Sequence, residues 1–133
     1  MLSPFVKLRE HCPLCQKLKS GAKAPDFLFD GGHVYVYKSP FADRWTGAIM
    51  PVFKKHIYEV SDIRPAELPD TLMTLVSFER ALRKTTQCER INFVKFGNVT
   101  HHLHWHLIPR YADEIFKTSN WPFHTLTNKT FIP

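Results

Sequence analysis

The sequence has no long hydrophobic run and few cysteines, and both features restrict the class of protein. No stretch of the 133 residues approaches the roughly 20 apolar residues of a membrane-spanning helix. The first ten residues also lack the uninterrupted apolar core of a signal peptide. Three cysteines are an odd and small number for a disulfide framework. We therefore expect a cytoplasmic protein without a membrane partner.

Basic residues are in excess, yet the sequence lacks a basic run of five or more. Lys and Arg number 18 against 12 Asp and Glu, which gives a formal net charge of +6. This balance favours an anionic partner, and the scattered charges favour a small anion, such as a nucleotide or phosphate ester, over specific nucleic-acid binding. There is no internal repeat, and 44% apolar residues in 133 indicate one domain with a single core.

Four of the eight histidines lie within the segment 101–110, which reads HHLHWHLIPR. Successive side chains of a β-strand point to opposite faces, so His102, His104 and His106 should share one face. Leu103, Trp105 and Leu107 should form the core face. Buried imidazoles need partners, and three chemistries suit this row: a metal site, a proton relay or a histidine nucleophile beside an anionic substrate. A strand face wetted only by solvent is the alternative.

The pattern of the chain predicts an α+β fold. A loop is expected over 16–25, and residues 30–32 should join a hairpin. Pro51 suggests an edge position or an irregular end for its strand. One helix is expected over 70–85, from the helical spacing of Leu72, Leu75, Val76 and Leu82. The expected elements form a mostly antiparallel five-stranded meander with the helix between the third and fourth strands; the strands span 27–29, 33–37, 47–53, 91–96 and 102–108.

Cys12 and Cys15 form a close Cys-x-x-Cys pair, far from Cys88. In a reducing compartment such a pair fits metal binding or redox use better than a structural disulfide. The pair alone is weak evidence for a metal, because two free surface thiols or a redox dithiol would have the same spacing.

Three motifs together resemble the histidine triad (HIT) family over roughly residues 12–111. Residues 102–108 match its signature of three histidines alternating with hydrophobic residues, and 108–111 resemble bacterial members. Residues 54–57, Lys-Lys-His-Ile, are similar to a segment of the Hint branch, whereas Pro109-Arg110 is shared with the dinucleoside polyphosphate hydrolase branch. Gly97-Asn98 lies where the family has a Gly-Gln or Gly-Asn pair.

The resemblance implies a HIT-like fold and a hydrolase acting at the α-phosphate of a purine nucleotide. The substrate would be a nucleoside phosphoramidate or a dinucleoside polyphosphate, and the intermediate a nucleotidyl-histidine. His104 would be the nucleophile, while His106 and Asn98 would contact the phosphoryl or leaving group. No divalent cation is required for such chemistry.

The resemblance also implies a structural zinc. In the zinc-containing relatives a Cys-x-x-Cys, a histidine after the third strand and the first triad histidine bind one ion. Here these residues are Cys12, Cys15, His56 and His102.

Two departures bear on the substrate. The family often has an acidic ribose-binding residue after the second strand, where this chain has Lys38 and Ser39. It also often has a histidine at the start of the third strand, and this chain has none there. We assign substrate binding to Lys38, Ser39, Asn98 and His106.

A single HIT domain should span 1–133, with a zinc loop at 11–25, a core at 26–111 and a tail at 112–133. The aromatic tail and the resemblance imply a homodimer in which Trp121 and Phe123 shape the leaving-group pocket. Three other functions stay open: a non-catalytic nucleotide- or partner-binding scaffold, a nucleotidyltransferase, and a metalloenzyme in which His102, His104 and His106 share one ion.

Overall fold

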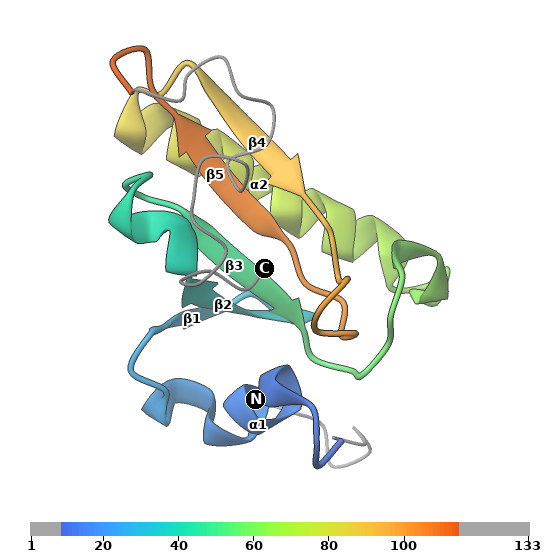
Figure 1. The fold of residues 1–133 in the computed structure, drawn as a ribbon. Coiled ribbons are helices and arrows are strands. Elements are labelled where there is room, and N and C mark those ends of the chain that lie inside the picture. The colour runs from blue at the N-terminus through green and yellow to red at the C-terminus, as the bar shows by residue number, and fades with distance from the viewer. Residues whose placement is uncertain (1–8, 115–133) are drawn as a thin grey trace.

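The computed structural model describes residues 9–114, which form one five-stranded antiparallel sheet with a helix on each face (Figure 1). Trp121 and Phe123 lie outside the described residues. The strands are β1 (Phe27–Asp30), β2 (Val34–Lys38), β3 (Ile49–Phe53), β4 (Arg90–Val94) and β5 (His106–Arg110). The helices are α1 (Pro13–Ser20) and α2 (Leu68–Thr86), and short 3₁₀ turns span Gly21–Lys23 (η1), Pro40–Asp43 (η2) and Val60–Asp62 (η3).

The predicted α+β class, five antiparallel strands and helix between the third and fourth strands are confirmed. The strand order is β1-β2-β3-β5-β4, so β5 lies between β3 and β4, whereas a strict meander would place β4 beside β3. Helix α2 carries the chain past the sheet position beside β3, which β5 occupies. Strands β4 and β5 then pair with each other over five residues, from Arg90 with Arg110 to Val94 with His106.

Pro51 lies in a central strand, so the edge position expected for it is wrong. Its carbonyl accepts a hydrogen bond from Trp105 N at 2.9 Å, but proline has no N–H to return the second bond of the pair. The β3–β5 ladder is accordingly reduced to Ile49 with Leu107 and one isolated bridge between Val52 and His104. For this reason β5 begins at His106 and not at the predicted residue 102.

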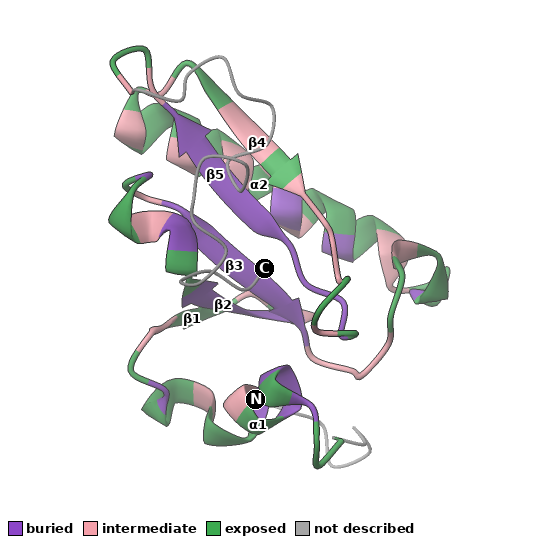
Figure 2. Cartoon of the chain, in the orientation of Figure 1, coloured by how far each residue is buried: buried purple, intermediate pink, exposed green. Residues whose placement is uncertain are grey.

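The two faces of the sheet support separate hydrophobic clusters. Helix α2 covers one face with Leu75, which is fully buried, and with the partly buried Leu68, Phe78 and Leu82. Leu72, expected in this apolar stripe, is 42% exposed. The central strands β2, β3 and β5 are the most uniformly buried part of the chain, as Figure 2 shows, whereas the edge strands β1 and β4 are partly exposed.

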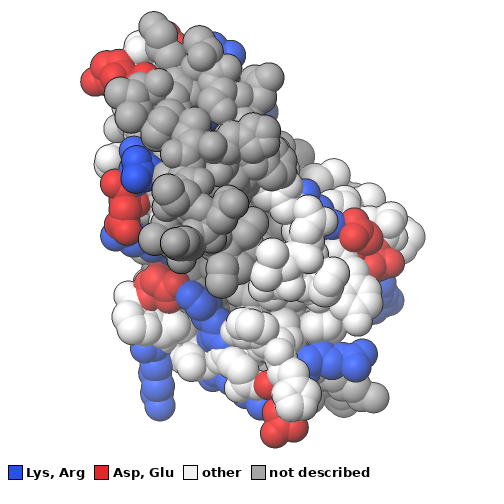
Figure 3. All heavy atoms as spheres, in the orientation of Figure 1, with Lys and Arg blue, Asp and Glu red and all other residues white. Residues whose placement is uncertain are grey.

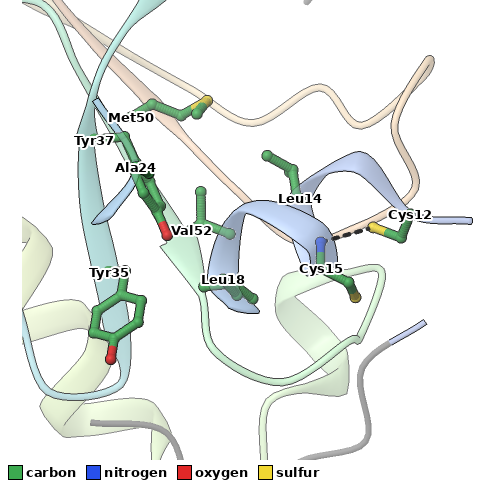
Figure 4. Packing of buried hydrophobic residues seen from close by; sticks show 9 residues of the cluster. All are labelled: Cys12, Leu14, Cys15, Leu18, Ala24, Tyr35, Tyr37, Met50 and Val52. Carbon is green, nitrogen blue, oxygen red and sulfur yellow. Dashed lines mark hydrogen bonds between the residues drawn. The ribbon is translucent and has the colours of Figure 1, made fainter. Parts of the chain in front are cut away.

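Helix α1 was not predicted, since residues 16–25 were expected to be a loop. Its signals are nevertheless local: Cys12 caps the N-terminus by accepting Cys15 N–H at 3.3 Å, Pro13 occupies the first turn, and Gly21 ends the helix at a φ of 53°. Leu14 and Leu18 face Tyr37, Met50 and Val52 of the sheet (Figure 4). This packing places Cys12 and Cys15 on the histidine face of the sheet.

Surface charge is dispersed. In the view of Figure 3, Lys and Arg side chains alternate with Asp and Glu over the described surface and do not gather in one patch. Among residues 9–114 no helix is both long and apolar enough to cross a membrane.

Candidate functional site

The alternation predicted for the histidine segment is present. Leu103, Trp105 and Leu107 belong to the cluster under α2, while the three histidines lie on the opposite face with α1 and η2. His102, His104 and His106 are each no more than 2% exposed. The row is therefore enclosed by protein, and each ring takes a defined set of partners.

In His104 one ring nitrogen is held by a backbone hydrogen bond and the other bears a lone pair. Its Nδ1 lies 2.6 Å from the carbonyl oxygen of His102, so Nδ1 carries the hydrogen and donates it. Its Nε2 then bears the lone pair, and within the described residues it has no hydrogen-bond partner. Burial lowers the pKa of His104, the hydrogen bond to the His102 carbonyl partly opposes this, and the charge of Lys95 lowers it further, so the ring is neutral near pH 7. A neutral imidazole in this tautomer is a nucleophile at Nε2.

His106 contacts the start of η2. Its Nδ1 lies 3.1 Å from the hydroxyl of Ser39, and its ring packs against Phe41 and His104 with centroid separations of 5.0 and 5.4 Å. Burial lowers the pKa of His106 to about 3. Its Nε2 is the one buried side-chain nitrogen or oxygen among residues 9–114 without a hydrogen-bond partner. Such an atom is costly to leave unpaired, so we treat it as a candidate ligand contact.

The four predicted metal ligands converge. The Nδ1 of His102 lies 3.4 Å from Cys12 Sγ, 3.5 Å from Cys15 Sγ and 3.2 Å from His56 Nδ1, and the last nitrogen lies 3.1 Å from Cys15 Sγ. All four ligand atoms lie within 4.8 Å of one another. They come from the start of α1, the loop after β3 and the segment before β5.

These atoms fit a tetrahedral zinc ion. Bonds of about 2.3 Å to sulfur and 2.0 Å to nitrogen would space the ligand atoms roughly 3.3–3.8 Å apart, close to the separations found. His102 is also in the required tautomer, because its Nε2 donates to the Phe53 carbonyl at 2.7 Å and leaves Nδ1 with a lone pair. Burial lowers the pKa of His102 to about 4, so the ring is neutral.

Of the remaining predicted residues, Ser39 touches this row through His106, whereas among residues 9–114 Lys38 and Asn98 make no side-chain hydrogen bond with it. Lys38 and Ser39 line a cavity of about 330 Å³ between α1 and η2, whose other walls include Leu14, Lys17, Asp43 and Met50. Ser39 is buried, and Lys38 is exposed at the end of β2. Asn98 is exposed in the turn after Gly97, whose φ of 71° suits glycine there. Within residues 9–114 no side-chain hydrogen bond joins Asn98 to His104.

A buried ionic network was missed by the sequence reading. Arg110 is 3% exposed; its Nε donates to Glu114 at 2.6 Å, its guanidinium donates to Asn92 at 2.7 Å, and the group lies over the Trp45 ring. Trp45 Nε1 donates to the same Glu114 carboxylate. The only sequence signal was the i, i+4 spacing of Arg110 and Glu114. The network attaches the residues that follow β5 to the segment after η2 and to β4.

Taken together, the fold and the site define a class: an antiparallel α+β protein with a buried row of neutral histidines beside a Cys₂His₂ cluster. Within residues 9–114 this cluster is the one group of metal-ligand type, and His104 and His106 are not in it. The HIT domain profile matches residues 35–113. The chain belongs to the HIT family.

Solved structures agree on the fold. A protein from Streptococcus mutans superposes with a TM-score of 0.67 at 19% identity, covering 81% of this chain and 71% of the other. A HIT family member from Bacillus subtilis gives 0.64 at 22% identity, with 78% and 76% covered. A HIT family hydrolase from Legionella pneumophila gives 0.56 at 16% identity, with 73% and 90% covered. Comparison with curated proteins gives no match.

Proposed function

We propose that the protein is a nucleotide hydrolase that attacks the α-phosphorus of a purine nucleoside phosphoramidate or dinucleoside polyphosphate. The observation that carries this proposal is the ring of His104. Its Nδ1–H is held by the His102 carbonyl at 2.6 Å, so Nε2 presents a lone pair from a neutral ring. Family membership and the hydrolase from Legionella support the reaction class.

In the first step, His104 Nε2 forms a bond to the α-phosphorus and the bond to the leaving group breaks. The leaving group departs with the bonding electron pair and takes a proton from solvent. In the second step, water attacks the phosphorus, the P–N bond breaks, and the nucleoside monophosphate leaves as a proton passes to solvent. The bond between Nδ1–H and the His102 carbonyl stabilises the positive charge that develops on the ring during attack.

The other site residues bind the substrate. His106 lies beside His104, with centroids 5.4 Å apart, and its unpaired Nε2 is placed to contact the phosphoryl oxygens or the leaving group. Lys38 and Ser39 line the 330 Å³ cavity that we assign to the substrate, and the Lys38 ammonium attracts its negative charge. Asn98 reaches the phosphoryl group from the turn between β4 and β5, which requires this exposed turn to close on the ligand.

Zinc at Cys12, Cys15, His56 and His102 has a structural role in this proposal. The ion would join α1, the loop after β3 and the segment before β5, and so fix the backbone of His102. Since His104 and His106 do not share a metal cluster within residues 9–114, a metalloenzyme using the three triad histidines on one ion is disfavoured. An intact His106 likewise disfavours a transferase resembling galactose-1-phosphate uridylyltransferase, whose triad replaces the last histidine.

The test is turnover of adenosine and guanosine phosphoramidates and dinucleoside polyphosphates by the wild type and by His104→Ala. We expect the variant to lose at least about 1,000-fold in kcat, because the covalent path is gone. A quenched wild-type reaction should show on His104 the added mass of one nucleotidyl group, that is, a nucleoside monophosphate less one water. The matched control is His101→Ala, an exposed histidine in the same segment, which should keep full activity.

A His104→Ala rate within about tenfold of the wild type would overturn the nucleophile assignment, since this corresponds to only about 1.4 kcal/mol of barrier. Because the ring is buried, the thermal melting curve of the variant must be recorded to show that it is folded. Nucleotide binding by the wild type without turnover of any substrate would instead favour the non-catalytic scaffold.

A further inference from the structure

Ser39 connects the start of η2 to the last histidine of the triad. Its hydroxyl oxygen accepts the N–H of Phe41 at 3.1 Å, which caps η2, and lies 3.1 Å from His106 Nδ1. Ser39 and His106 are 2% and 1% exposed. The contact joins positions 67 apart in the chain and is therefore a feature of the folded protein.

The hydrogen of this contact belongs to one partner or the other. A buried hydroxyl has one hydrogen to donate, and leaving it unpaired is unfavourable. Within residues 9–114 the acceptor in reach of Ser39 is His106 Nδ1, since Phe41 N–H can only donate. If Ser39 donates, Nδ1 bears a lone pair and the hydrogen of the neutral ring resides on Nε2.

We infer that Ser39 is a positioning residue that holds His106 in its Nε2–H tautomer, so that the triad presents a lone pair at His104 and an N–H donor at His106. The two neighbouring rings thereby have opposite tautomers, one fixed by the His102 carbonyl and the other by a hydroxyl. This assignment deepens the proposed function and rests on it for its catalytic consequence.

The consequence concerns charge on the phosphoryl group. An Nε2–H aimed at a phosphate oxygen donates a hydrogen bond that strengthens as negative charge accumulates, whereas a bare Nε2 would repel the same oxygen. As a neutral donor, His106 transfers no proton. Its buried Nε2, which has no hydrogen-bond partner within residues 9–114, gains one when such an acceptor binds. Ser39 acts through His106, although its hydroxyl does not itself touch the reacting atoms.

The tautomer can be measured without any substrate. Protein labelled with ¹⁵N-histidine is examined by long-range ¹H–¹⁵N correlation, in which the two ring nitrogens of each tautomer have distinct shifts and couplings. His106 is assigned by the signals missing from His106→Asn. We expect a protonated Nε2 in the wild type and in Ser39→Thr, which retains the hydroxyl, and a mixture of tautomers in Ser39→Ala.

Activity on a nucleoside phosphoramidate then tests the consequence. Ser39→Ala should lower kcat about tenfold with KM changed less than about threefold, which corresponds to losing roughly one aligned hydrogen bond in the transition state. Ser39→Thr should recover most of this loss, and melting curves of both variants report the separate cost of the η2 cap.

Two results would overturn the inference: a protonated Nδ1 on His106 in the wild type, or an unchanged tautomer in Ser39→Ala. These spectra are recorded without ligand, so they stand even if no phosphoramidate is cleaved. A confirmed tautomer combined with absent turnover would contradict the proposed function and leave the role of Ser39 in place.

Discussion

At the residue scale, burial determines what the three histidines can do. Each ring is enclosed, and desolvation lowers the pKa of all three, so none is cationic near neutral pH. What differs among them is which ring nitrogen is engaged and by which group: a backbone carbonyl accepts from Nε2 of His102 and from Nδ1 of His104, and a hydroxyl contacts Nδ1 of His106. In the proposed function these differences assign the three identical side chains three roles: a metal ligand, a nucleophile and a hydrogen-bond donor.

The buried, neutral state of His106 makes unfolding sensitive to acid. Its pKa is about 3 in the folded protein, against roughly 6.5 when unfolded. Below pH 6.5 the unfolded chain therefore binds the extra proton, and the free energy of unfolding falls by about 1.4 kcal/mol per pH unit until the pH reaches about 3. The loss per unit is largest between about pH 5.5 and 4.

We expect His106→Asn to reduce the pH dependence of the free energy of unfolding by the contribution of one proton, because the variant has no titratable ring at this position. Urea unfolding of wild type and variant at several pH values between about 4 and 5.5 measures it. Both proteins retain the same Cys₂His₂ cluster, so acid-driven metal release contributes equally and cancels in the comparison. Equal slopes would show that His106 is not neutral in the folded state.

Residue identity was the part of the site most accessible from sequence. Alternation alone placed the three histidines opposite Leu103 and Trp105, and this arrangement is confirmed. The tautomers were not accessible, because they depend on contacts such as Ser39 with His106 that form only in the fold. Burial of the histidine face also needed α1 and η2 in place.

At the element scale, α1 shows how a short helix escapes detection. Its eight residues carry only Leu14 and Leu18 as buried apolar positions besides Cys15, and four of its other residues are polar or basic, which resembles a loop. The helix is stabilised by tertiary packing on Tyr37 and Met50 more than by its own propensity (Figure 4). A zinc ion bound at Cys12 and Cys15 would add to that stabilisation.

Loss of one thiolate should therefore affect metal content and stability together. We expect Cys15→Ser to lower zinc content well below one per chain and the melting midpoint by about 10 °C or more, because a structural site couples metal binding to folding. Elemental analysis and calorimetry measure the two quantities. Cys88→Ser, outside the cluster, is the matched control and should change neither.

Chelation of the wild type should reproduce the Cys15→Ser melting curve, and chelation of the variant should add little. Wild-type protein without zinc, whose melting is also unchanged on adding zinc, would exclude the site.

The network after β5 predicts a second stability effect. Glu114→Ala removes the carboxylate that pairs with the buried Arg110 and leaves that guanidinium partly uncompensated, so we expect a loss of about 3 kcal/mol in the free energy of unfolding. Glu89→Ala is the control, because its contact with Arg90 is long and solvent-exposed and should contribute less than about 0.5 kcal/mol. Similar losses in both variants would contradict the buried role of Glu114.

At the scale of the whole molecule, strand order was the feature least determined by sequence. The composition of each strand is compatible with several neighbours, and helix α2 permits β4 to pair with β3 or to lie beyond β5. Pairing of β4 with β5 over five residues, together with Pro51 weakening the β3–β5 ladder, selects the observed order only in the assembled sheet.

The same order leaves two edge strands, and they are not equivalent. The register of β1 against β2 is irregular between Phe27 and Phe29, a feature that discourages further pairing, whereas β4 pairs regularly along its full length. Phe93 on β4 is 39% exposed. Given the family resemblance, we expect a homodimer in which the sheets of two chains join along β4.

Light scattering should accordingly give a mass about twice the 15.6 kDa of one chain. Phe93→Glu places a charge at the β4 edge and should yield a monomer, because burying an unpaired carboxylate between two chains is costly. Leu28→Glu is the matched control on β1, where Leu28 is 47% exposed, and should leave the dimer intact. A wild-type mass near 15.6 kDa would exclude the dimer, and dissociation by Leu28→Glu but not by Phe93→Glu would move the interface to the opposite edge of the sheet.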